Sequence, residues 1–278
     1  MRRIPQPTVL AAALLLVCGQ NAFGADPVPI EIDCDPANYS TDDAPVPGTT
    51  VISGEIIIGT EAGEKLNGTD EDDLILGLGG NDKIAGHKGN DIMCGGEGND
   101  KIRGGDGMDQ ADGGPGRDNI KTDSEDDIQR GGPGDDRVDG GSGNDQIWGD
   151  DGDDKVVGEG DDDILVGGPG DDKISGGGDD DMLYGGDGDD RLVGGAGQDL
   201  LDCGDGDDNA RGGGGDDEIH GGPGFDRLRG QADDDTITGG PDNDILDGSS
   251  GFDELDGGLG DFDSCKKGEI VFECEEIK

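Results

Sequence analysis

Three nine-residue units stand side by side between Gly167 and Val193, as GGPGDDKIS, GGGDDDMLY and GGDGDDRLV. Each unit begins with glycines, continues into aspartates and ends around one aliphatic residue. With Gly167 as position 1, steps of nine in both directions carry the frame from Gly59 to Cys265 in 23 units, with no insertion or deletion expected. Such a frame predicts one periodic domain in which each unit packs on its neighbours.

The positions within the unit have distinct characters. Position 6 is Asp in 21 successive units, from Asp73 to Asp253, and departs only at the ends, with Glu64 and Phe262. Position 8 is aliphatic almost throughout, and positions 1, 2 and 4 are mostly Gly. Because glycine accepts positive φ, positions 1 to 6 predict a turn. Positions 7 to 9, which read polar, apolar, polar, predict a minimal strand.

A strand of three residues buries nothing alone, so the units must stack. If each unit reverses the chain, two units close one coil of about 18 residues, and strands two units apart lie parallel at about 4.8 Å. Right-handed winding is favoured for such crossovers. The predicted fold is therefore all-β, a right-handed parallel β-roll (β-solenoid) of about eleven coils and about 55 Å in length, with short caps at both ends.

This stacking brings the position 6 carboxylates of successive coils together, in 19 pairs between Asp73 and Asp253. At about 5 Å each pair repels by roughly 0.8 kcal/mol in a water-like dielectric and by about 3 kcal/mol at an effective dielectric near 20. The sum exceeds the usual folding stability of about 5–15 kcal/mol, so a cation is needed. Carboxylate and carbonyl oxygens suit calcium. Zinc and copper prefer His or Cys clusters, and His87 and His220 stand isolated.

The units GGPGDDKIS and GGDGDDRLV resemble the nonapeptide G-G-x-G-x-D-x-U-x of repeats-in-toxin (RTX) proteins, which form calcium-binding parallel β-rolls. The flanking segments look like those of stand-alone bacterial secreted calcium-binding proteins with this repeat. The resemblance implies that position 6 aspartates and turn carbonyls hold several calcium ions between successive coils. The candidate ligands are Asp73, Asp82, Asp91, Asp100, Asp109, Asp118, Asp136, Asp145, Asp154, Asp163, Asp172, Asp181, Asp190, Asp199, Asp208, Asp217, Asp226, Asp235, Asp244 and Asp253.

One unit departs from the pattern in its middle. Thr122 to Arg130 reads TDSEDDIQR, without any glycine and with Gln129 where an aliphatic residue belongs. Ala111, at position 8 one coil earlier, fills less of the core on the same side of the roll than a larger aliphatic residue would. Asp127 is therefore a doubtful ligand, and the core is expected to be weakest at this point.

Composition alone is also compatible with disorder. The formal net charge is −49, aromatic residues make up 3%, and the chain has 61 Gly and 12 Pro. The strict period argues against disorder in the presence of a cation. The acidic charge disfavours binding to nucleic acid.

The N-terminus has the features of a secretory signal peptide over residues 1–25. Arg2 and Arg3 precede an apolar run, Val9 to Val17, which is too short to span a bilayer, and small residues stand before Ala25. Secretion to the extracellular space follows, with the cell surface or periplasm as other destinations, and no other segment is expected to span a membrane. The remaining divisions are an N-terminal cap (26–58) with a cap strand at Val51 to Ile58, the roll (59–265) and a C-terminal cap (266–278).

Five cysteines remain after such cleavage, and an exported chain favours disulfides. Cys265 and Cys274 flank the C-terminal end, where their disulfide is expected to pin the apolar run Ile270 to Phe272 over the final coil. Cys34 and Cys94 can tie the N-terminal cap to the fourth unit, which leaves Cys203 over.

Sequence motifs of catalysis are missing. The chain has no His-Glu-x-x-His run, no Gly-x-Ser-x-Gly elbow and no EF-hand loop. Periodic metal ligands explain the close carboxylates better than a glycosidase pair does. We therefore expect a non-enzymatic, secreted calcium-binding protein with a structural or interaction role outside the cell. The alternatives are a surface adhesin or matrix component, and an accessory rod of a separately encoded secreted enzyme or toxin. An extracellular or cell-surface protein partner fits each of these roles.

Overall fold

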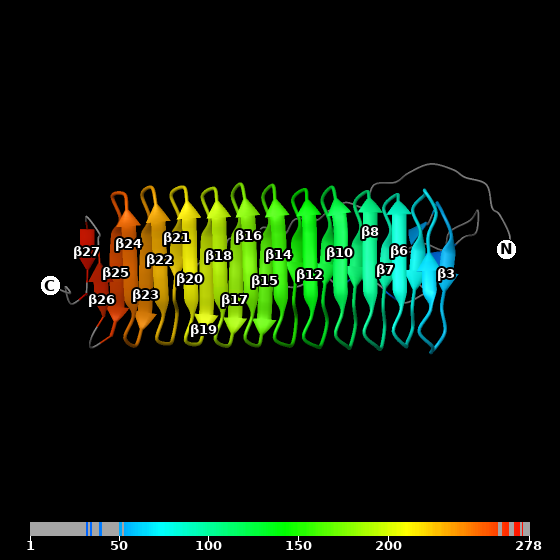
Figure 1. Ribbon diagram of the computed structural model, residues 1–278, viewed down its shortest axis with the longest axis horizontal. Coiled ribbons are helices and arrows are strands. Elements are labelled where there is room, and N and C mark those ends of the chain that lie inside the picture. Colours follow the sequence, from blue (N-terminus) through cyan, green and yellow to red (C-terminus); the bar gives the residue numbers. More distant parts are fainter. Residues whose placement is uncertain are drawn as a thin grey trace.

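The computed structural model describes residues 32, 34, 39–40, 50–51, 53–260, 263–266, 270–272 and 274. Their regular elements are all β-strands, and they form a straight rod of parallel strands (Figure 1). The predicted all-β parallel solenoid is thus confirmed. The expected signal peptide lies outside the described residues, as do most of the two cap segments.

Two long parallel sheets make the walls of the rod. The β4 sheet has 12 strands. In chain order they are β4 (Lys65–Asn67), β6 (Lys83–Lys88), β8 (Lys101–Asp106), β10 (Asn119–Ser124), β12 (Arg137–Ser142), β14 (Lys155–Gly160), β16 (Lys173–Gly178), β18 (Arg191–Ala196), β20 (Asn209–Gly214), β22 (Arg227–Ala232), β24 (Ile245–Ser250) and β26 (Ser264–Lys266).

The β3 sheet faces it and has 13 strands. They are β3 (Ile56–Ile58), β5 (Leu74–Leu76), β7 (Ile92–Cys94), β9 (Gln110–Asp112), β11 (Ile128–Arg130), β13 (Gln146–Trp148), β15 (Ile164–Pro169), β17 (Met182–Asp187), β19 (Leu200–Asp205), β21 (Glu218–His220), β23 (Thr236–Pro241), β25 (Glu254–Leu259) and β27 (Ile270–Phe272). A separate two-stranded sheet pairs β1 (Tyr39–Ser40) with β2 (Thr50–Val51).

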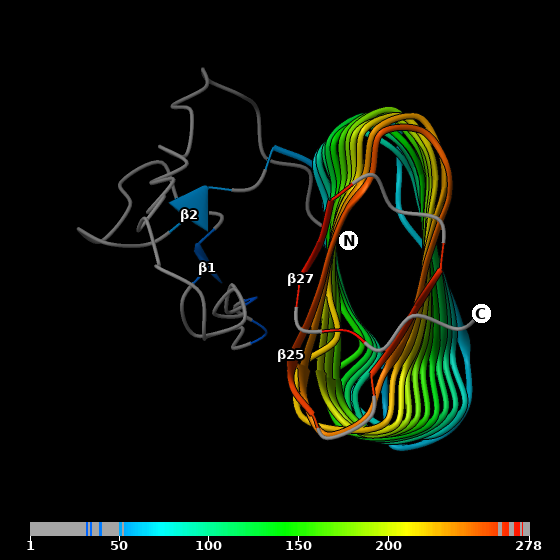
Figure 2. The same cartoon turned by 90° about the vertical axis from the view of Figure 1, so that its left-hand side faces the viewer.

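Up to β24 in one sheet and β25 in the other, neighbouring strands lie 18 residues apart in the chain. In the β4 sheet, Lys173 pairs with Arg191 and Ile174 pairs with Leu192. Seen along the rod, the coils superpose as one flattened oval (Figure 2). Two nine-residue units therefore make one coil, as the alternation of turn and strand predicts.

The core is a thin file of position 8 side chains between the sheets. Ile174, Leu183 and Leu192 come from successive units, and each is at most 2% exposed. Positive φ is concentrated at positions 2 and 4 of the turn, as at Gly168 (φ 115°) and Gly170 (φ 144°). A side chain at Gly168 would also meet the carbonyl oxygen of Asp150 in the coil before. The glycines are thus required both by backbone conformation and by the close approach of the turns.

The ladder begins one unit before Gly59, because β3 pairs with β5 in the 18-residue register. The single cap strand expected from Val51 to Ile58 is wrong. Val51 belongs to β2, and Ser53 and Gly54 separate it from β3. The amide of Gly54 donates to the carbonyl of Asp72 at 2.7 Å. That bond places Ser53 and Gly54 in the turn of a coil instead of in a continuous strand.

The last unit contains an insertion, so the prediction of an uninterrupted nine-residue frame is wrong at its end. Leu246 pairs with Cys265, and Asp244 donates its amide to Oδ1 of Asp263 at 3.0 Å, each 19 residues apart instead of 18. One extra residue in the final turn moves Asp263 into position 6 and Cys265 into position 8. The assignment of Phe262 to position 6 is therefore wrong, and this unit does present a buried carboxylate.

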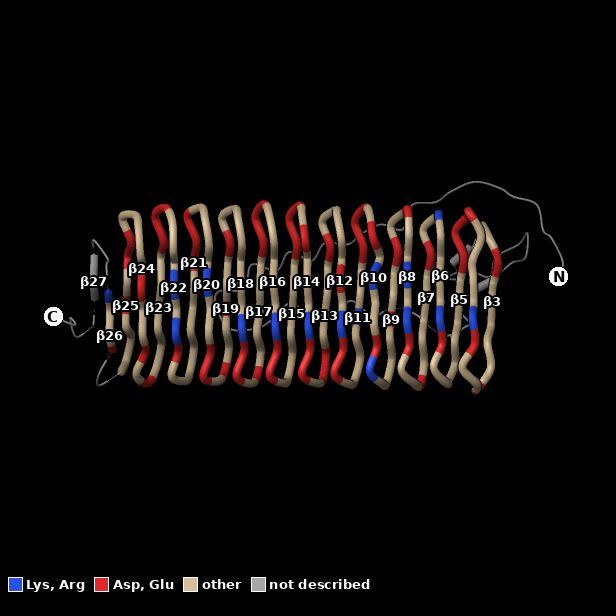
Figure 3. Tube along the Cα trace, in the orientation of Figure 1, with Lys and Arg blue, Asp and Glu red and all other residues tan. Residues whose placement is uncertain are grey.

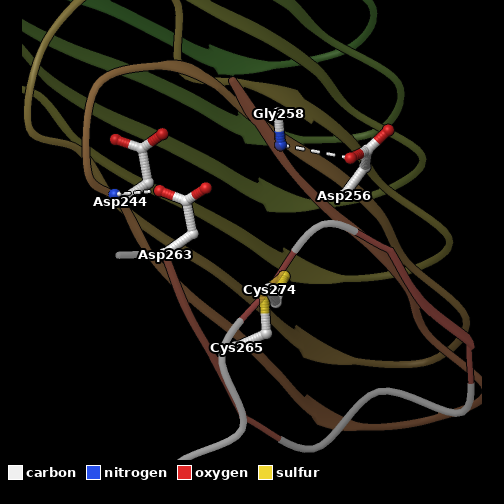
Figure 4. The surroundings of a disulfide bond; sticks show 6 residues. All are labelled: Asp244, Asp256, Gly258, Asp263, Cys265 and Cys274. Atoms are coloured by element: carbon white, nitrogen blue, oxygen red, sulfur yellow. Dashed lines mark hydrogen bonds between the residues drawn. A yellow bond between two sulfur atoms is a disulfide. The ribbon is translucent and has the colours of Figure 1, made fainter. Parts of the chain in front are cut away.

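The expected disulfide Cys265–Cys274 is present, and so is Cys34–Cys94, whose pairing the sequence left open. Cys34–Cys94 joins the N-terminal segment to β7, and both cysteines pack with Leu74 and Leu76 on the outer surface of the β3 sheet. Cys265–Cys274 links β26 to the residues after β27 (Figure 4). Since β27 pairs with β25, the run Ile270–Phe272 continues the β3 sheet as its last strand. Cys203 is a free thiol buried in the core.

Candidate metal site between the coils

The position 6 aspartates form two continuous hydrogen-bonded columns inside the turns. Asp172 is 1% exposed, and its Oδ1 accepts the backbone amide of Asp154 at 2.7 Å. Its own amide donates to Oδ1 of Asp190 at 2.8 Å. The same bond joins all 19 pairs from Asp73 to Asp253, so one carboxylate oxygen of each pair fixes the register.

The second oxygen of these carboxylates is buried without a hydrogen-bond partner among the described residues. This holds for Oδ2 of Asp82, Asp91, Asp100, Asp109, Asp118, Asp127, Asp136, Asp145, Asp154, Asp163, Asp172, Asp181, Asp190, Asp199, Asp208, Asp217, Asp226, Asp235, Asp244 and Asp263. Buried polar groups are almost always paired. A regular series of unpaired anionic oxygens therefore indicates a bound cation.

In most of these units, the glycine at position 1 leaves room beside Oδ2 that a side chain would fill. A Cβ placed on Gly167 would meet Oδ2 of Asp172 and the carbonyl oxygen of Gly185 in the next coil. Within the described residues no three His, Cys, Asp or Glu side chains converge on one point. An ion here must therefore take much of its coordination from backbone carbonyls. A single carboxylate with several carbonyls is an all-oxygen donor set, and it fits calcium.

Burial raises the pKa of most of these carboxyls. Loss of water raises the pKa of Asp172 to about 7 and that of Asp190 to about 8, although the backbone amide that each carboxyl accepts opposes the shift. Neighbouring aspartates add a smaller increase. In the absence of a cation, the ionised form is thus disfavoured in the folded rod near neutral pH.

The first candidate ligand differs from the rest. Oδ2 of Asp73 accepts the amide of Thr69 at 2.5 Å and its hydroxyl at 3.0 Å. This carboxylate already has protein donors on its second oxygen. It therefore lacks the unpaired oxygen that marks the other candidate sites.

The unit Thr122 to Arg130 keeps the turn shape without glycine. Asp123 and Glu125 take positive φ of 78° and 74°. The hydroxyl of Thr122, which stands at position 1, donates to the carbonyl of Gly140 at 3.2 Å and accepts from Nε2 of Gln129 at 2.7 Å. In other coils the corresponding carbonyl oxygen lies beside Oδ2 of the aspartate, as that of Gly185 does at Gly167. Here the hydroxyl of Thr122 occupies that carbonyl, so Asp127 stays a doubtful ligand.

A family model for the RTX calcium-binding nonapeptide repeat (4 copies) matches residues 58–93, 67–102, 95–120, 103–128, 130–165, 157–192, 166–201, 193–228, 202–237, 220–255 and 238–261. The chain belongs to the RTX calcium-binding repeat family. Together the matches cover nearly the whole rod. No curated protein sequence matches the chain.

RTX repeats bind calcium, and the β-solenoid with its columns of unpaired carboxylate oxygens is the structural form of that property in this chain. The protein is thus a calcium-binding RTX repeat protein. Two disulfides in the RTX rod are consistent with an extracellular protein. The described part of the chain has no helix with the length and apolar character needed to cross a membrane.

Sequence reasoning missed Asp263 as a site residue. Its carboxylate is 2% exposed, and its Oδ2 is unpaired like those of the other RTX units. The usable signal was the tripeptide Asp263-Ser264-Cys265, in which an Asp stands two residues before a small apolar residue. A search that allows one extra residue in the RTX turn would have found it.

Proposed function

We propose that this chain is a secreted rod that folds when calcium enters between its coils, and that its role is structural or one of interaction and not catalytic. The observation that carries the proposal is the series of buried, unpaired Oδ2 atoms along both edges of the rod. The proposed ligands are the position 6 aspartates named above with the turn carbonyls beside them. Asp263 is added to them, and Asp73 and Asp127 are the weakest members.

Charge repulsion supports folding coupled to binding. Asp172 and Asp190 lie in adjacent coils, joined by the hydrogen bond from the amide of Asp172 to Oδ1 of Asp190, and 18 further pairs repeat this arrangement. Even at roughly 0.8 kcal/mol for each pair, the total repulsion exceeds the stability of a typical domain, about 5–15 kcal/mol. A calcium ion beside each Oδ2 would turn this repulsion into attraction. Its binding energy would then be folding energy.

An extracellular setting is supported by two features. The N-terminal sequence has the pattern of a signal peptide, and two disulfides tie the ends. Under this proposal the chain remains unfolded where calcium is scarce and folds after export.

The test is far-UV circular dichroism of the chain without residues 1–25, together with fluorescence of Trp148, the single tryptophan, which is 2% exposed. We expect coil in chelator at neutral pH and low salt, and β-structure with a shifted Trp148 emission at about millimolar calcium. Magnesium at the same concentration should not substitute, since it demands a stricter octahedron. A chain already fully β-structured in chelator under these conditions would disprove coupled folding.

A further inference from the structure

The two sheets of the rod present very different outer faces. Position 7 of the β4 sheet carries eight basic residues in one row, at Lys65, Lys83, Lys101, Arg137, Lys155, Lys173, Arg191 and Arg227. Position 7 of the β3 sheet carries only uncharged or acidic residues, such as Leu74, Ile164 and Glu218. Figure 3 shows a line of basic positions along the rod, with further basic positions beside it, between two margins of acidic turns. We name these eight residues the basic row.

The basic row is exposed and mostly unpaired. All eight side chains are exposed, and within the described residues only Arg137 forms an ion pair, at 3.5 Å to Asp139. This is unexpected in a chain with a net charge of −49, where carboxylates are abundant. The cations are therefore available to a ligand from outside.

The row is not explained by the calcium sites. Both turn edges carry the same position 6 aspartates, yet a cation follows them on only one edge. Asp172 precedes Lys173, whereas Asp163, equally buried, precedes Ile164. If position 7 cations served to neutralise the aspartates, both sheets would need them.

The row also carries a repulsive cost of its own. Lys155, Lys173 and Arg191 are direct neighbours in the ladder, and strands of a sheet lie about 4.8 Å apart. Like charges directly opposite each other destabilise a sheet. That spacing is shorter than the screening length of about 8 Å at physiological salt, so neighbouring cations of the row repel each other. A linear array of anions would relieve this repulsion, as calcium relieves that of the aspartate columns.

Two surface depressions lie on this same face. One is lined by Arg137, Lys155 and Lys173 of the row with Arg117 and Asn119, and also by five aspartates of the adjoining turns, Asp118, Asp135, Asp136, Asp153 and Asp154. The other is lined by Arg211, Arg227, Arg229 and Lys266 towards the C-terminal end, with Asp247 ion-paired to Lys266. In the latter, Nε of Arg211 is buried without a hydrogen-bond partner in the described structure. The second depression therefore offers donors to an anion, whereas at the first the basic row borders an acidic turn.

From these observations we propose that the basic row binds a linear anionic polysaccharide, with carboxylate or sulfate groups on its sugars, along the β4 sheet. The row is straight, four further basic residues stand at position 9 of the same sheet (Arg103, Lys121, Arg211 and Arg229), and acidic turns border this face on both sides. A flat anionic membrane or a wide double-stranded nucleic acid would have to meet those turns as well. A thin chain with regularly spaced anions fits between the margins. The proposal goes beyond calcium binding, which prepares this face by folding the rod.

The test uses the full mature chain in millimolar calcium and a fluorescent heparin oligosaccharide as the probe, followed by fluorescence anisotropy. We expect binding that weakens steeply with salt, and no binding of neutral dextran of equal length. The triple variant Lys155→Gln, Lys173→Gln, Arg191→Gln should weaken binding about tenfold, since each surface ion pair contributes modestly. Its slope of log affinity against log salt should be shallower.

Lys88→Gln is the matched control for Lys173→Gln, because Lys88 is exposed but stands outside the row, beside Asp106 in the ladder. Only Lys173→Gln should weaken binding. Circular dichroism in calcium must show every variant folded, which separates this test from that of calcium-coupled folding. If the triple variant binds the oligosaccharide as tightly as the parent chain, the affinity comes from calcium bridges at the acidic turns and the proposal is overturned. Tighter binding of single-stranded DNA or of anionic vesicles than of the oligosaccharide would also overturn it.

Discussion

The backbone amide of Asp172 donates to Oδ1 of Asp190, 18 residues further along, at 2.8 Å, while Oδ2 of the same Asp190 is buried and unpaired. The two oxygens of one carboxylate thus have separate tasks. Oδ1 holds successive coils in register through a neutral donor, and Oδ2 is left for a cation. This division allows the two tasks to be separated by mutation.

Asp172→Asn should remove calcium without breaking the ladder. The amide oxygen of Asn can still accept from Asp154, but an NH₂ group replaces the anionic Oδ2. We expect at least one calcium ion fewer per chain by elemental analysis after dialysis. The calcium-bound rod should lose about 1–3 kcal/mol in stability, seen as a lower melting temperature.

The control for this variant is Asp171→Asn. Asp171 is exposed in the same turn, and its Oδ1 accepts the amide of Asp189 at 3.1 Å, a bond that Asn preserves. Calcium content should not change. If Asp172→Asn binds as many ions as the parent chain, the assignment of Oδ2 is wrong.

Gly167→Ala should close a candidate site from the other side. The φ of Gly167 lies outside the left-handed region, so alanine fits the backbone, but its Cβ would meet Oδ2 of Asp172 and the carbonyl of Gly185. We expect loss of calcium at this coil and a higher calcium concentration at the midpoint of folding. Gly178→Ala, where a Cβ meets nothing within 4 Å, should behave as the parent does. Equal midpoints for both variants would show that the pocket beside Gly167 holds no ion.

Acidification should partly replace calcium. Burial raises the folded-state pKa of Asp154, Asp163 and Asp190 to about 8, well above the ordinary range of an Asp carboxyl. Groups with a raised folded pKa stabilise the fold fully below the unfolded value and lose that contribution as pH rises through the folded value. The calcium-free chain should therefore gain β-structure by circular dichroism at about pH 5 and lose it by about pH 8. More β-structure at pH 8 than at pH 5 would reverse the expected sign.

The C-terminal disulfide should protect the open end of the stack. Cys265 and Cys274 close a loop of about ten residues, which stabilises the end by roughly 2–3 kcal/mol. Replacing both by Ser should leave calcium uptake by the central coils nearly unchanged, because each coil depends mainly on its neighbours. It should also increase calcium-dependent self-association through the freed strand edge, measured by light scattering. A double variant that stays monomeric, with its end still protected from hydrogen exchange, would contradict this role.

Sequence periodicity predicted the stacking because a period of nine with one apolar position leaves few other ways to bury side chains. Ile174 and Leu192 pair as the frame requires. The frame failed at its end, where fixed steps of nine placed Phe262 and not Asp263 at position 6. An insertion in a turn costs little and leaves the strands intact, so it is invisible to a search with a rigid period.

Features that depend on side-chain geometry were also beyond the sequence. Thr69 donates to Oδ2 of Asp73, and nothing in the repeat pattern distinguishes that aspartate from Asp82. The pairing of Cys34 with Cys94 was one open possibility. The structure adds that it covers Leu74 and Leu76 on the outer wall and not the end of the stack.

Crystals of the calcium-loaded chain, measured at a wavelength where calcium scatters anomalously, test the central claim most directly. The account predicts anomalous peaks in two columns along the turns, each about 2.3–2.6 Å from an Oδ2 such as that of Asp172 and from turn carbonyls. A folded rod whose peaks lie only at exposed turn carboxylates such as Asp171, with Oδ2 of Asp172 free of any ion, would contradict it.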